Sequence, residues 1–477
     1  MENKPLLSRS LVSCYDASVK VLQFGTGAFL KGFVNAIIED INLANPGEEM
    51  GVCAVKLRQG NSQQIDQINA QQGLFSLQIR GIAQGKIIDE IRIISCQQYA
   101  LSPYDDEAAY WALSQLPDLK WIVSNSTEAG IAYHPEDTSS ERLGSGFPAK
   151  LTQLLYKRWQ YFHGEASRAV SILCCELIDD NSHQLLALMT RYAREWQLPE
   201  EFIYWLSNEC CYANTLVDRI VPGKPVTSAP LGYIDNELIE AEPYYLWAIE
   251  CRGPLRDQLQ RMLQRVKQHN VVLCDDLTPF RTRKVRVLNG GHTSTVAVSL
   301  LAGVALVRDA MNDADLSAFM ASLLRNEVAA TLQDQGEDEI AVYVADILDR
   351  FKNPYLAHAW QSILMNSISK TVARLLPTIS DSVSAGNLPR YLLTGLAALL
   401  VLYRDHPQWV NDSSESCETL HILLAAGFDA ESVSACLVSQ KVFNDTDLAS
   451  QSNVCEYIAS QALAIQSDGV RKVIQDL

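Results

Sequence analysis

Basic residues are scarce in this chain of 477 residues. Its 56 acidic side chains outnumber its 39 lysines and arginines, which gives a formal net charge of −17. Nucleic acids and anionic membranes are themselves negatively charged, so this imbalance argues against both as binding partners. A small anionic ligand would need a local cluster of basic residues.

The spacing of a metal site or of a disulfide framework is also missing. The twelve cysteines include the adjacent pairs Cys174-Cys175 and Cys210-Cys211 but no Cys-x2-Cys, and the eight histidines are scattered without ligand spacing. These patterns do not indicate paired zinc ligands, and we expect no metal ion. Reduced, mostly buried thiols in a cytosolic protein are the expectation for the cysteines.

Long apolar runs are absent as well. Charged and polar residues interrupt the segment from Met1 to Lys20, so it contains no apolar core of a signal peptide. The longest apolar run, Tyr391 to Tyr403, includes Thr394 and Gly395 and is shorter than the roughly 20 residues of a membrane span. We expect a cytoplasmic protein with no membrane partner, and its length predicts two or three domains.

The first half of the chain alternates strand and helix patterns. Val19 to Phe24 is a compact apolar strand, followed by Gly25-Thr26-Gly27 and then by a helical pattern from Phe33 to Ile41. A glycine turn between strand and helix lets a dinucleotide phosphate approach the backbone and the free N–H groups of the helix. The usual third glycine is replaced by Leu30, so a plain strand-to-helix turn stays open as the alternative.

Two further strand ends bear on a bound dinucleotide. The segment Lys56-Leu57-Arg58-Gln59-Gly60 ends the second predicted strand without the carboxylate that usually binds the adenosine ribose, which leaves NAD and NADP open. Another strand, Trp121 to Asn125, precedes Ser126-Thr127-Glu128. Ligands lie beyond the carboxyl ends of strands in open α/β sheets, which predicts Asn125 and Glu128 beside the nicotinamide end of the cofactor. The alternative is that Ser126 or Thr127 merely caps a helix.

The segment from Lys284 to His292 has the strongest catalytic signal. Lys284, Asn289 and His292 would share one wide face of a helix predicted from about Thr282 to Val307, spread over about 12 Å of rise. They offer an ammonium, an amide and an imidazole, which suits proton transfer to a substrate in a groove. The pair Gly290-Gly291 would allow close approach to the helix, either of a ligand or of another helix.

The second half reads as almost entirely helical. Apolar spacing predicts helices over Leu316–Val328, Ile340–Phe351, Trp360–Leu376, Leu388–Tyr403 and Val454–Ile465. The predicted fold class is therefore α/β plus all-α. An N-terminal Rossmann-like dinucleotide-binding domain, residues 1–280, contains a hairpin insertion near residues 74–94 and precedes a helical substrate-binding domain, residues 281–477. The tail beyond about residue 405, with its loop Asn411–Glu415, is expected to carry little chemistry.

A second basic group runs from Arg350 through His358 to Lys370 and Arg374. Lys370 and Arg374 are four residues apart, so on a helix they share one face and could hold a carboxylate or several hydroxyls. The alternative is an ordinary solvated basic face.

The arrangement Lys284-x4-Asn289-x2-His292 resembles the signature of the zinc-independent long-chain polyol dehydrogenases, the mannitol dehydrogenase family. Four more segments resemble the branch of that family that reduces the ketohexuronate tagaturonate to the aldonate altronate: Gln23–Leu30, Ser124–Ile131, Cys175–Asp179 and Thr215–Val221. The similarity runs from about residue 20 to about residue 400.

This resemblance implies roles for individual residues. It implies NAD as the cofactor, with Lys284 as general acid and base, assisted by Asn289 and His292, and with no metal ion. It places Asp218, His358, Lys370 and Arg374 on the substrate, a sugar acid. It implies that the cofactor is bound by Phe24, Gly25, Thr26, Gly27, Ala28, Phe29, Asn125 and Glu128.

Three alternatives remain open at this point. The substrate could be fructuronate, which gives mannonate, or an uncharged polyol of the mannitol type. A dinucleotide-sensing regulatory protein would keep the glycine turn but would have no use for Lys284, Asn289 and His292 together.

Overall fold

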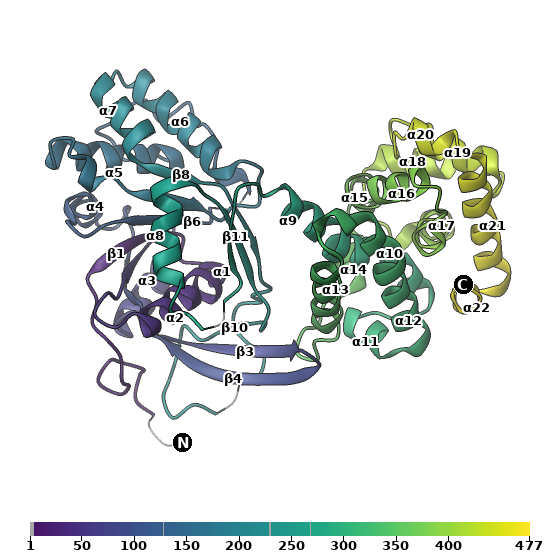
Figure 1. Ribbon diagram of the computed structural model, residues 1–477, viewed down its shortest axis with the longest axis horizontal. Coiled ribbons are helices and arrows are strands. Elements are labelled where there is room, and N and C mark those ends of the chain that lie inside the picture. Colours follow the sequence, from purple (N-terminus) through teal and green to yellow (C-terminus); the bar gives the residue numbers. More distant parts are fainter. Residues whose placement is uncertain (1–3, 127, 229, 268) are drawn as a thin grey trace. The chain divides into compact units, whose positions relative to one another are not determined.

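The computed structural model of the protein describes residues 4–126, 128–228, 230–267 and 269–477 (Figure 1). The chain divides into two compact units. The N-terminal unit comprises Met1–Arg80 and Ile88–Leu277, and the C-terminal unit comprises Gly81–Ile87 and Thr278–Leu477. The first is built on a parallel sheet and the second is mostly helical, which confirms the predicted fold class.

A six-stranded parallel sheet forms the centre of the N-terminal unit. Its strands lie in the order β5-β2-β1-β6-β7-β8. The order reverses between β1 and β6, and open α/β sheets bind their ligands at such a switch point, outside the carboxyl ends of the strands. The strands are β1 Val19–Phe24, β2 Gly51–Val55, β5 Gln97–Leu101, β6 Trp121–Ser124, β7 Ser171–Cys174 and β8 Cys211–Ala213.

Alternate residues of these strands point to opposite faces of the sheet and enter two separate cores. Val21 and Val123 belong to one core, whereas their neighbours Leu22 and Ile122 belong to the other. The helices in these cores are α2 (Ala36–Ala44) and α8 (Gly253–Leu263) in the first and α5 (Phe147–Tyr161) and α6 (Asn181–Glu195) in the second. Because both faces are covered, the strands are mostly apolar in sequence, although β1 includes Lys20 and Gln23 and β5 begins with two glutamines.

The remaining helical segments of this unit are short. They are α1 Ala28–Leu30, η1 Lys31–Asn35, α3 Gln63–Ala70, α4 Glu107–Ala112, η2 Leu113–Gln115, η3 Glu128–Gly130, η4 Ala166–Arg168, α7 Glu200–Tyr204 and η5 Trp205–Glu209.

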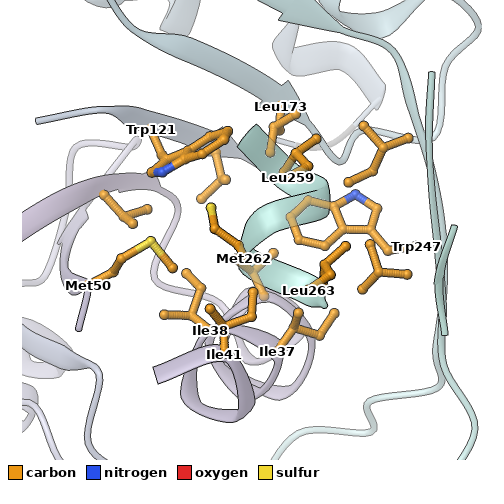
Figure 2. A pocket seen from close by; sticks show the side chains of 15 residues that line it. Ile37, Ile38, Ile41, Met50, Trp121, Leu173, Trp247, Leu259, Met262 and Leu263 are labelled. Carbon is orange, nitrogen blue, oxygen red and sulfur yellow. The ribbon is translucent and has the colours of Figure 1, made fainter. Parts of the chain in front are cut away.

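The first core contains a small cavity of about 40 Å³ (Figure 2). Its walls are apolar side chains, among them Trp121 from β6, Met262 from α8 and Trp247. Binding of a dinucleotide or a sugar acid requires charges and hydrogen-bond donors, so this cavity is a feature of core packing and not the ligand site.

Two three-stranded sheets, in the orders β10-β3-β4 and β12-β11-β9, complete the N-terminal unit. The hairpin predicted near residues 74–94 is confirmed as β3 (Phe75–Ala83) and β4 (Lys86–Ile94). Its tip, Gly81–Ile87, belongs to the C-terminal unit, where the Gly85 N–H donates to the Asp349 carboxylate at 2.8 Å. The other strands are β9 Thr215–Asp218, β10 Ile239–Ala241, β11 Leu246–Glu250 and β12 Val271–Cys274.

A continuous helical stretch opens the main part of the C-terminal unit. It consists of α9 (Thr278–Arg283), the π-helical segment η6 (Lys284–Asn289) and α10 (Gly290–Leu301), so it begins and ends earlier than the predicted helix. Residues 290–299 are all buried, because α10 packs against α14, α15 and α17. The middle of this unit is thus the helix that carries His292.

The prediction of one helix from Trp360 to Leu376 is wrong. The structure has α14 (Trp360–Leu364), α15 (Ser367–Arg374) and α16 (Leu376–Ser384). Between α14 and α15, Asn366 adopts φ 55° and ψ 40°, a left-handed conformation that interrupts an α-helix and that asparagine tolerates better than most residues. The apolar spacing continues across this break, so periodicity could not reveal it.

The other helices of this unit are α11 Val307–Asn312, α12 Ala314–Ser322, η7 Leu323–Val328, η8 Ala329–Gln335, α13 Glu337–Phe351, α17 Arg390–Asp405, η9 Pro407–Trp409, α18 Ser414–Leu423, α19 Ala430–Val438, α20 Thr446–Ala449, α21 Ser452–Asp468 and α22 Val470–Gln475. Within the described ranges, no helix combines the length and the apolar character that crossing a membrane requires.

Candidate functional site

The Gly25-Thr26-Gly27 turn follows β1 at the switch point of the sheet. Gly25 has φ 130°, and a Cβ on it would lie 3.0 Å from Leu30 Cδ1 and 3.3 Å from the Asn125 carbonyl oxygen. The turn therefore requires glycine at this position. At Gly27, in contrast, a Cβ would meet no described atom within 4 Å, so a phosphate has room to approach the backbone.

Gly27 precedes a helical stretch that continues through α1, η1 and α2 to Ala44. The first N–H groups of a helix lack partners within it and favour anions. Thr26 and Gln64 brace the turn, since Thr26 Oγ1 donates to Gln64 Oε1 at 3.0 Å and Gln64 Nε2 donates to the Thr26 carbonyl at 3.1 Å. The turn therefore fits a dinucleotide pyrophosphate. The other predicted cofactor residues here are Phe24, which is buried, and Ala28 and Phe29, which are half-buried.

Asn125 lies on the other side of the switch point, directly after β6. Its Nδ2 donates to the Cys175 carbonyl at 2.7 Å and so joins the ends of β6 and β7. The backbone of Glu128 begins η3, whereas its side chain lies outside the described part of the chain. Of the two predicted nicotinamide residues, Asn125 is therefore placed at the expected strand end.

Glu176 is a buried residue at this edge to which the sequence assigned no role. Its carboxylate accepts hydrogen bonds from Ser124 Oγ at 3.0 Å and from the Ser126 N–H and Oγ at 2.8 Å each. Burial raises the pKa of this carboxyl group despite these hydrogen bonds. Glu176 thus fixes the loop that follows β6.

Lys56 and Arg58 follow the end of β2, and these are the basic residues that left the choice between NAD and NADP open. Lys56 Nζ donates to the carbonyl oxygens of Gly60 at 2.7 Å and Asn61 at 2.6 Å. Its ammonium is therefore already engaged in holding its own loop. Arg58 is exposed.

Lys284 and Asn289 are the first and last residues of η6, and His292 follows in α10. The predicted shared face assumed α-helical geometry, whereas a π-helix forms i→i+5 hydrogen bonds and has a different angular spacing. Segments of this kind inside α-helices are frequent at functional sites. Lys284 and Asn289 are half-buried. No hydrogen bond joins the side-chain amide of Asn289 or the ring of His292 to another described residue.

The Gly290-Gly291 pair allows close approach of neighbouring protein, which is the second of the two alternatives. A Cβ on Gly291 would lie 3.2 Å from Leu324 Cδ2 and 3.3 Å from Phe351 Cε2. A Cβ on Gly290 would lie 3.4 Å from the Val285 carbonyl oxygen. These glycines therefore serve the packing that surrounds His292.

Aromatic rings surround His292. Its ring centroid lies 4.3 Å from that of Phe351, 5.1 Å from that of His358 and 6.1 Å from that of Trp360. Burial, and then the nearby positive groups, hold the pKa of His292 well below its usual value. A neutral imidazole keeps one nitrogen as an acceptor, so His292 can accept a hydrogen bond from a substrate hydroxyl at neutral pH.

The basic residues next to His292 are His358, Arg350, Arg374 and Lys370. Burial and then the charge of Arg374 lower the pKa of Lys370, and burial and then Lys370 lower that of His358. Lys370 Nζ donates to the Ile363 carbonyl at 2.8 Å, and Arg374 Nη1 donates to Thr293 Oγ1 at 3.2 Å. The C-terminal unit thus brings His292 together with three of the predicted substrate residues, in a basic cluster that suits an anion.

Asp218, the fourth predicted substrate residue, belongs to the N-terminal unit. It ends β9, is paired in register with Leu246 of β11 and is 6% exposed. Its carboxylate therefore lies at a strand end, like the predicted cofactor residues of the same unit.

Sequence reasoning named Arg350 as the start of the second basic group, but it did not place Arg350, Phe351 or Trp360 beside His292. Phe351 and Trp360 looked like ordinary core positions. Arg350 carried a usable signal, because it lies on the stripe of Tyr343 and Ile347 at intervals of four and three residues. It is 4% exposed, and a buried arginine on an apolar stripe needs partners or an anion.

The chain matches two domain families. The mannitol dehydrogenase Rossmann domain matches residues 19–278, and the mannitol dehydrogenase C-terminal domain matches residues 276–466.

Curated relatives named altronate oxidoreductase cover most of the chain. The one from Klebsiella pneumoniae (strain 342) is 36% identical over 473 residues, which is 96% of each chain. The one from Bacillus subtilis (strain 168) is 38% identical over 399 residues, covering 82% of this chain and 81% of the relative.

Two solved structures share the fold. A D-sorbitol dehydrogenase in substrate-free form has a TM-score of 0.82 at 19% identity, covering 98% of this chain and 100% of its own. Mannitol 2-dehydrogenase from Pseudomonas fluorescens, in a ternary complex with NAD and D-mannitol, has a TM-score of 0.64 at 18% identity, covering 99% and 96%. The resemblance seen in the sequence is thereby confirmed, and the chain belongs to the mannitol dehydrogenase family.

Proposed function

We propose that the protein is an NAD-dependent oxidoreductase of the cytoplasm that reduces the ketone of tagaturonate to the alcohol of altronate and catalyses the reverse oxidation. The proposal rests on family membership and on the basic cluster around His292 in an otherwise strongly acidic chain. The curated relatives named altronate oxidoreductase, at 34–38% identity, support the same substrate class.

When bound, NAD would supply the hydride for reduction and accept it in the reverse oxidation. The Gly25-Thr26-Gly27 turn would hold its pyrophosphate, and Asn125 lies at the strand end beside the switch point. Lys56 Nζ already donates to two carbonyl oxygens and to Ser62 Oγ, so a 2′-phosphate would have to replace one of these acceptors, which favours NAD over NADP.

Lys284 gives its proton to the carbonyl oxygen during reduction and takes it back during oxidation. The Asn289 amide donates a hydrogen bond to the same oxygen, where negative charge develops. Neutral His292 accepts a hydrogen bond from a substrate hydroxyl. An ammonium and an amide together polarise the carbonyl, so no metal ion takes part in this mechanism.

The observation that carries the sugar-acid assignment is the basic cluster of His358, Lys370, Arg374 and Arg350. A carboxylate placed there gains charge-assisted hydrogen bonds. It also offsets the charge of Arg374, which together with the larger effect of burial lowers the pKa of Lys370. An uncharged polyol would form no charge-assisted hydrogen bond of this kind with the cluster.

Replacing Lys370 tests the assignment. Lys370→Ala should raise KM for tagaturonate by roughly 10–100-fold, the usual worth of one charge-assisted hydrogen bond, and should raise KM for an uncharged ketose far less. The difference should shrink at high salt. The matched control is Lys352→Ala, an exposed lysine just after α13, which should leave both values unchanged.

An equal effect of Lys370→Ala on both substrates would contradict the sugar-acid assignment. Steady-state rates with tagaturonate, fructuronate and uncharged ketoses, each with NADH and NADPH, separate the proposal from the related dehydrogenases. A protein that binds NADH but turns over none of these substrates would instead be a dinucleotide sensor.

A further inference from the structure

The N-terminus of α15 is held by a distant loop. Asn366 precedes α15 and provides no side-chain cap, although the first N–H groups of a helix need acceptors from elsewhere. The acceptors come from the loop before α18. The Asn366 N–H donates to the Asn411 carbonyl at 2.9 Å, and the Ile368 N–H donates to Asp412 Oδ2 at 3.0 Å.

Asp412 is itself fixed in place. Tyr403 Oη donates to Asp412 Oδ2 at 2.8 Å, and the Ser413 N–H donates to Asp412 Oδ1 at 3.0 Å. Tyr403 belongs to α17 and is 5% exposed. Burial, and then its hydrogen bond to Asp412, raise the pKa of this tyrosine, which is the expected effect of a neighbouring carboxylate. The loop is therefore anchored to the core of the C-terminal unit.

The helix that Asp412 holds is the one that carries Lys370 and Arg374. Residues 367–374 contain no acidic side chain, so the helix cannot balance these two charges itself. The negative charge of Asp412 raises the pKa of Lys370, against burial and Arg374, which lower it. Asp412 thus acts on α15 both as a remote cap and as a counter-charge.

We propose that Asp412 is a positioning residue for the substrate. By fixing the first turn of α15, it sets where Lys370 and Arg374 stand in the basic cluster, without touching the substrate. The inference rests on the proposed function, because it assumes that these two cations bind the substrate carboxylate.

An ordinary helix cap in the same tail provides a matched comparison. Asp445 Oδ1 accepts from the Leu448 N–H at 2.9 Å and caps α20, which carries none of the predicted site residues. Loss of either side chain removes one hydrogen bond to a helix N–H, and loss of Asp412 also removes the bonds from Tyr403 Oη and the Ser413 N–H. A positioning role predicts that only the loss of Asp412 changes substrate affinity.

The experiment compares Asp412→Ala, Asp412→Asn and Asp445→Ala in the full-length protein. Asp412→Ala should raise KM for tagaturonate by roughly 5–30-fold, with kcat within about threefold and NADH affinity unchanged. KM for an uncharged ketose should change much less. Asp412→Asn should restore part of the affinity, because its amide oxygen still accepts one hydrogen bond, and Asp445→Ala should leave KM unchanged.

The second measurement is the energetic coupling between Asp412 and Lys370. In the double variant with Lys370→Ala, Asp412→Ala should add less than the product of the two single effects, because both disturb one contact. If Asp412→Ala does not fold, Tyr403→Phe can take its place in the test. This variant loses one hydrogen bond to Asp412 and should raise KM for tagaturonate by about twofold to fivefold.

A folded Asp412→Ala variant with unchanged KM would overturn the positioning role, as would an equal rise for charged and uncharged substrates. If Lys370→Ala raised KM while Asp412→Ala did not, the positioning role alone would fail. If neither variant affected KM, the proposed function would fail together with it.

Discussion

Lys284 has the clearest chemical task in the proposed mechanism, because no other predicted residue donates the proton. Lys284→Met keeps most of the stem's volume and removes the ammonium. We expect kcat to fall by roughly 10²–10⁴-fold, the usual worth of a positioned proton donor, while NADH affinity stays near native. Near-native kcat with an unshifted pH profile would show that another group transfers the proton.

The open space beside Gly27 leads to a second residue-scale prediction. A valine side chain at this position would meet no described protein atom at its Cβ, but it would occupy the approach to the turn. Gly27→Val should therefore fold and lose most of its NADH affinity, measured by fluorescence titration. The control is Gly232→Ala, because a Cβ at Gly232 also meets no described atom within 4 Å and φ is not positive there. Gly223→Ala would be unsuitable as a control, because Gly223 has φ 97°. Unchanged NADH affinity in folded Gly27→Val would remove the turn from the cofactor site.

Individual residues differ in how well the sequence predicts their surroundings. The glycine turn was recognisable because strand, turn and helix are adjacent in the chain and their order carries the meaning. The meeting of His292 with His358 joins segments that are far apart in sequence, and only the packing of α10 brings them together. No role could be predicted for Glu176 and Asp412, because the sequence alone does not distinguish a buried carboxylate from an exposed one.

At the scale of elements, Glu327 of η7 caps the start of α17. Its two carboxylate oxygens accept from the Tyr391 and Leu392 N–H groups, each at 2.8 Å. Burial raises its pKa to about 7, from a usual value of 4.5. The folded state therefore binds this proton more tightly than the unfolded state, so stability is lost as pH rises from about 4.5 through about 7.

Glu327→Gln carries no charge at any of these pH values, so it tests that titration. Between about pH 5 and about pH 7.5, the Tm of the wild-type protein should fall relative to that of the variant. The measurement is thermal unfolding across this range, with Glu415→Gln as an exposed control. Parallel curves for Glu327→Gln and wild type would mean that Glu327 does not titrate in this range.

The sequence predicted whole helices and strands best where buried residues recur at regular intervals. Strands β1, β2 and β6 were visible because both faces of the sheet are covered, whereas β5, which begins with two glutamines, and the three-residue β8 were not predicted. Helices α13, α17 and α21 were visible from their periodic spacing. The π-helical segment at Lys284–Asn289 and the break at Asn366 were not, because both leave the order of apolar residues unchanged. Both irregularities lie at or next to predicted site residues, and departures from regular local structure are most frequent at functional sites.

For the whole molecule, the two units should respond to different ligands. NADH should slow amide hydrogen exchange at residues 24–30 and 124–126 of the N-terminal unit, because a bound cofactor would stabilise this turn and these strand ends against local opening. Altronate should slow exchange at residues 284–293 and 366–374 of the C-terminal unit. Hydrogen exchange followed by mass spectrometry measures both. In Gly27→Val, the NADH effect should vanish and the altronate effect should remain; the reverse pattern would contradict the assignment of the two sites.

The hairpin β3–β4 limits how far the two units can be exchanged between related proteins. Its tip, Gly81–Ile87, which includes the end of β3 and the start of β4, belongs to the C-terminal unit, although the rest of both strands lies in the N-terminal one. A chimera joined at Leu277–Thr278 would therefore combine the hairpin tip of one parent with the Asp349 of the other. Neither unit is a single continuous piece of the gene, so residues 81–87 have to be transferred with the C-terminal half for the hybrid to keep its own contacts.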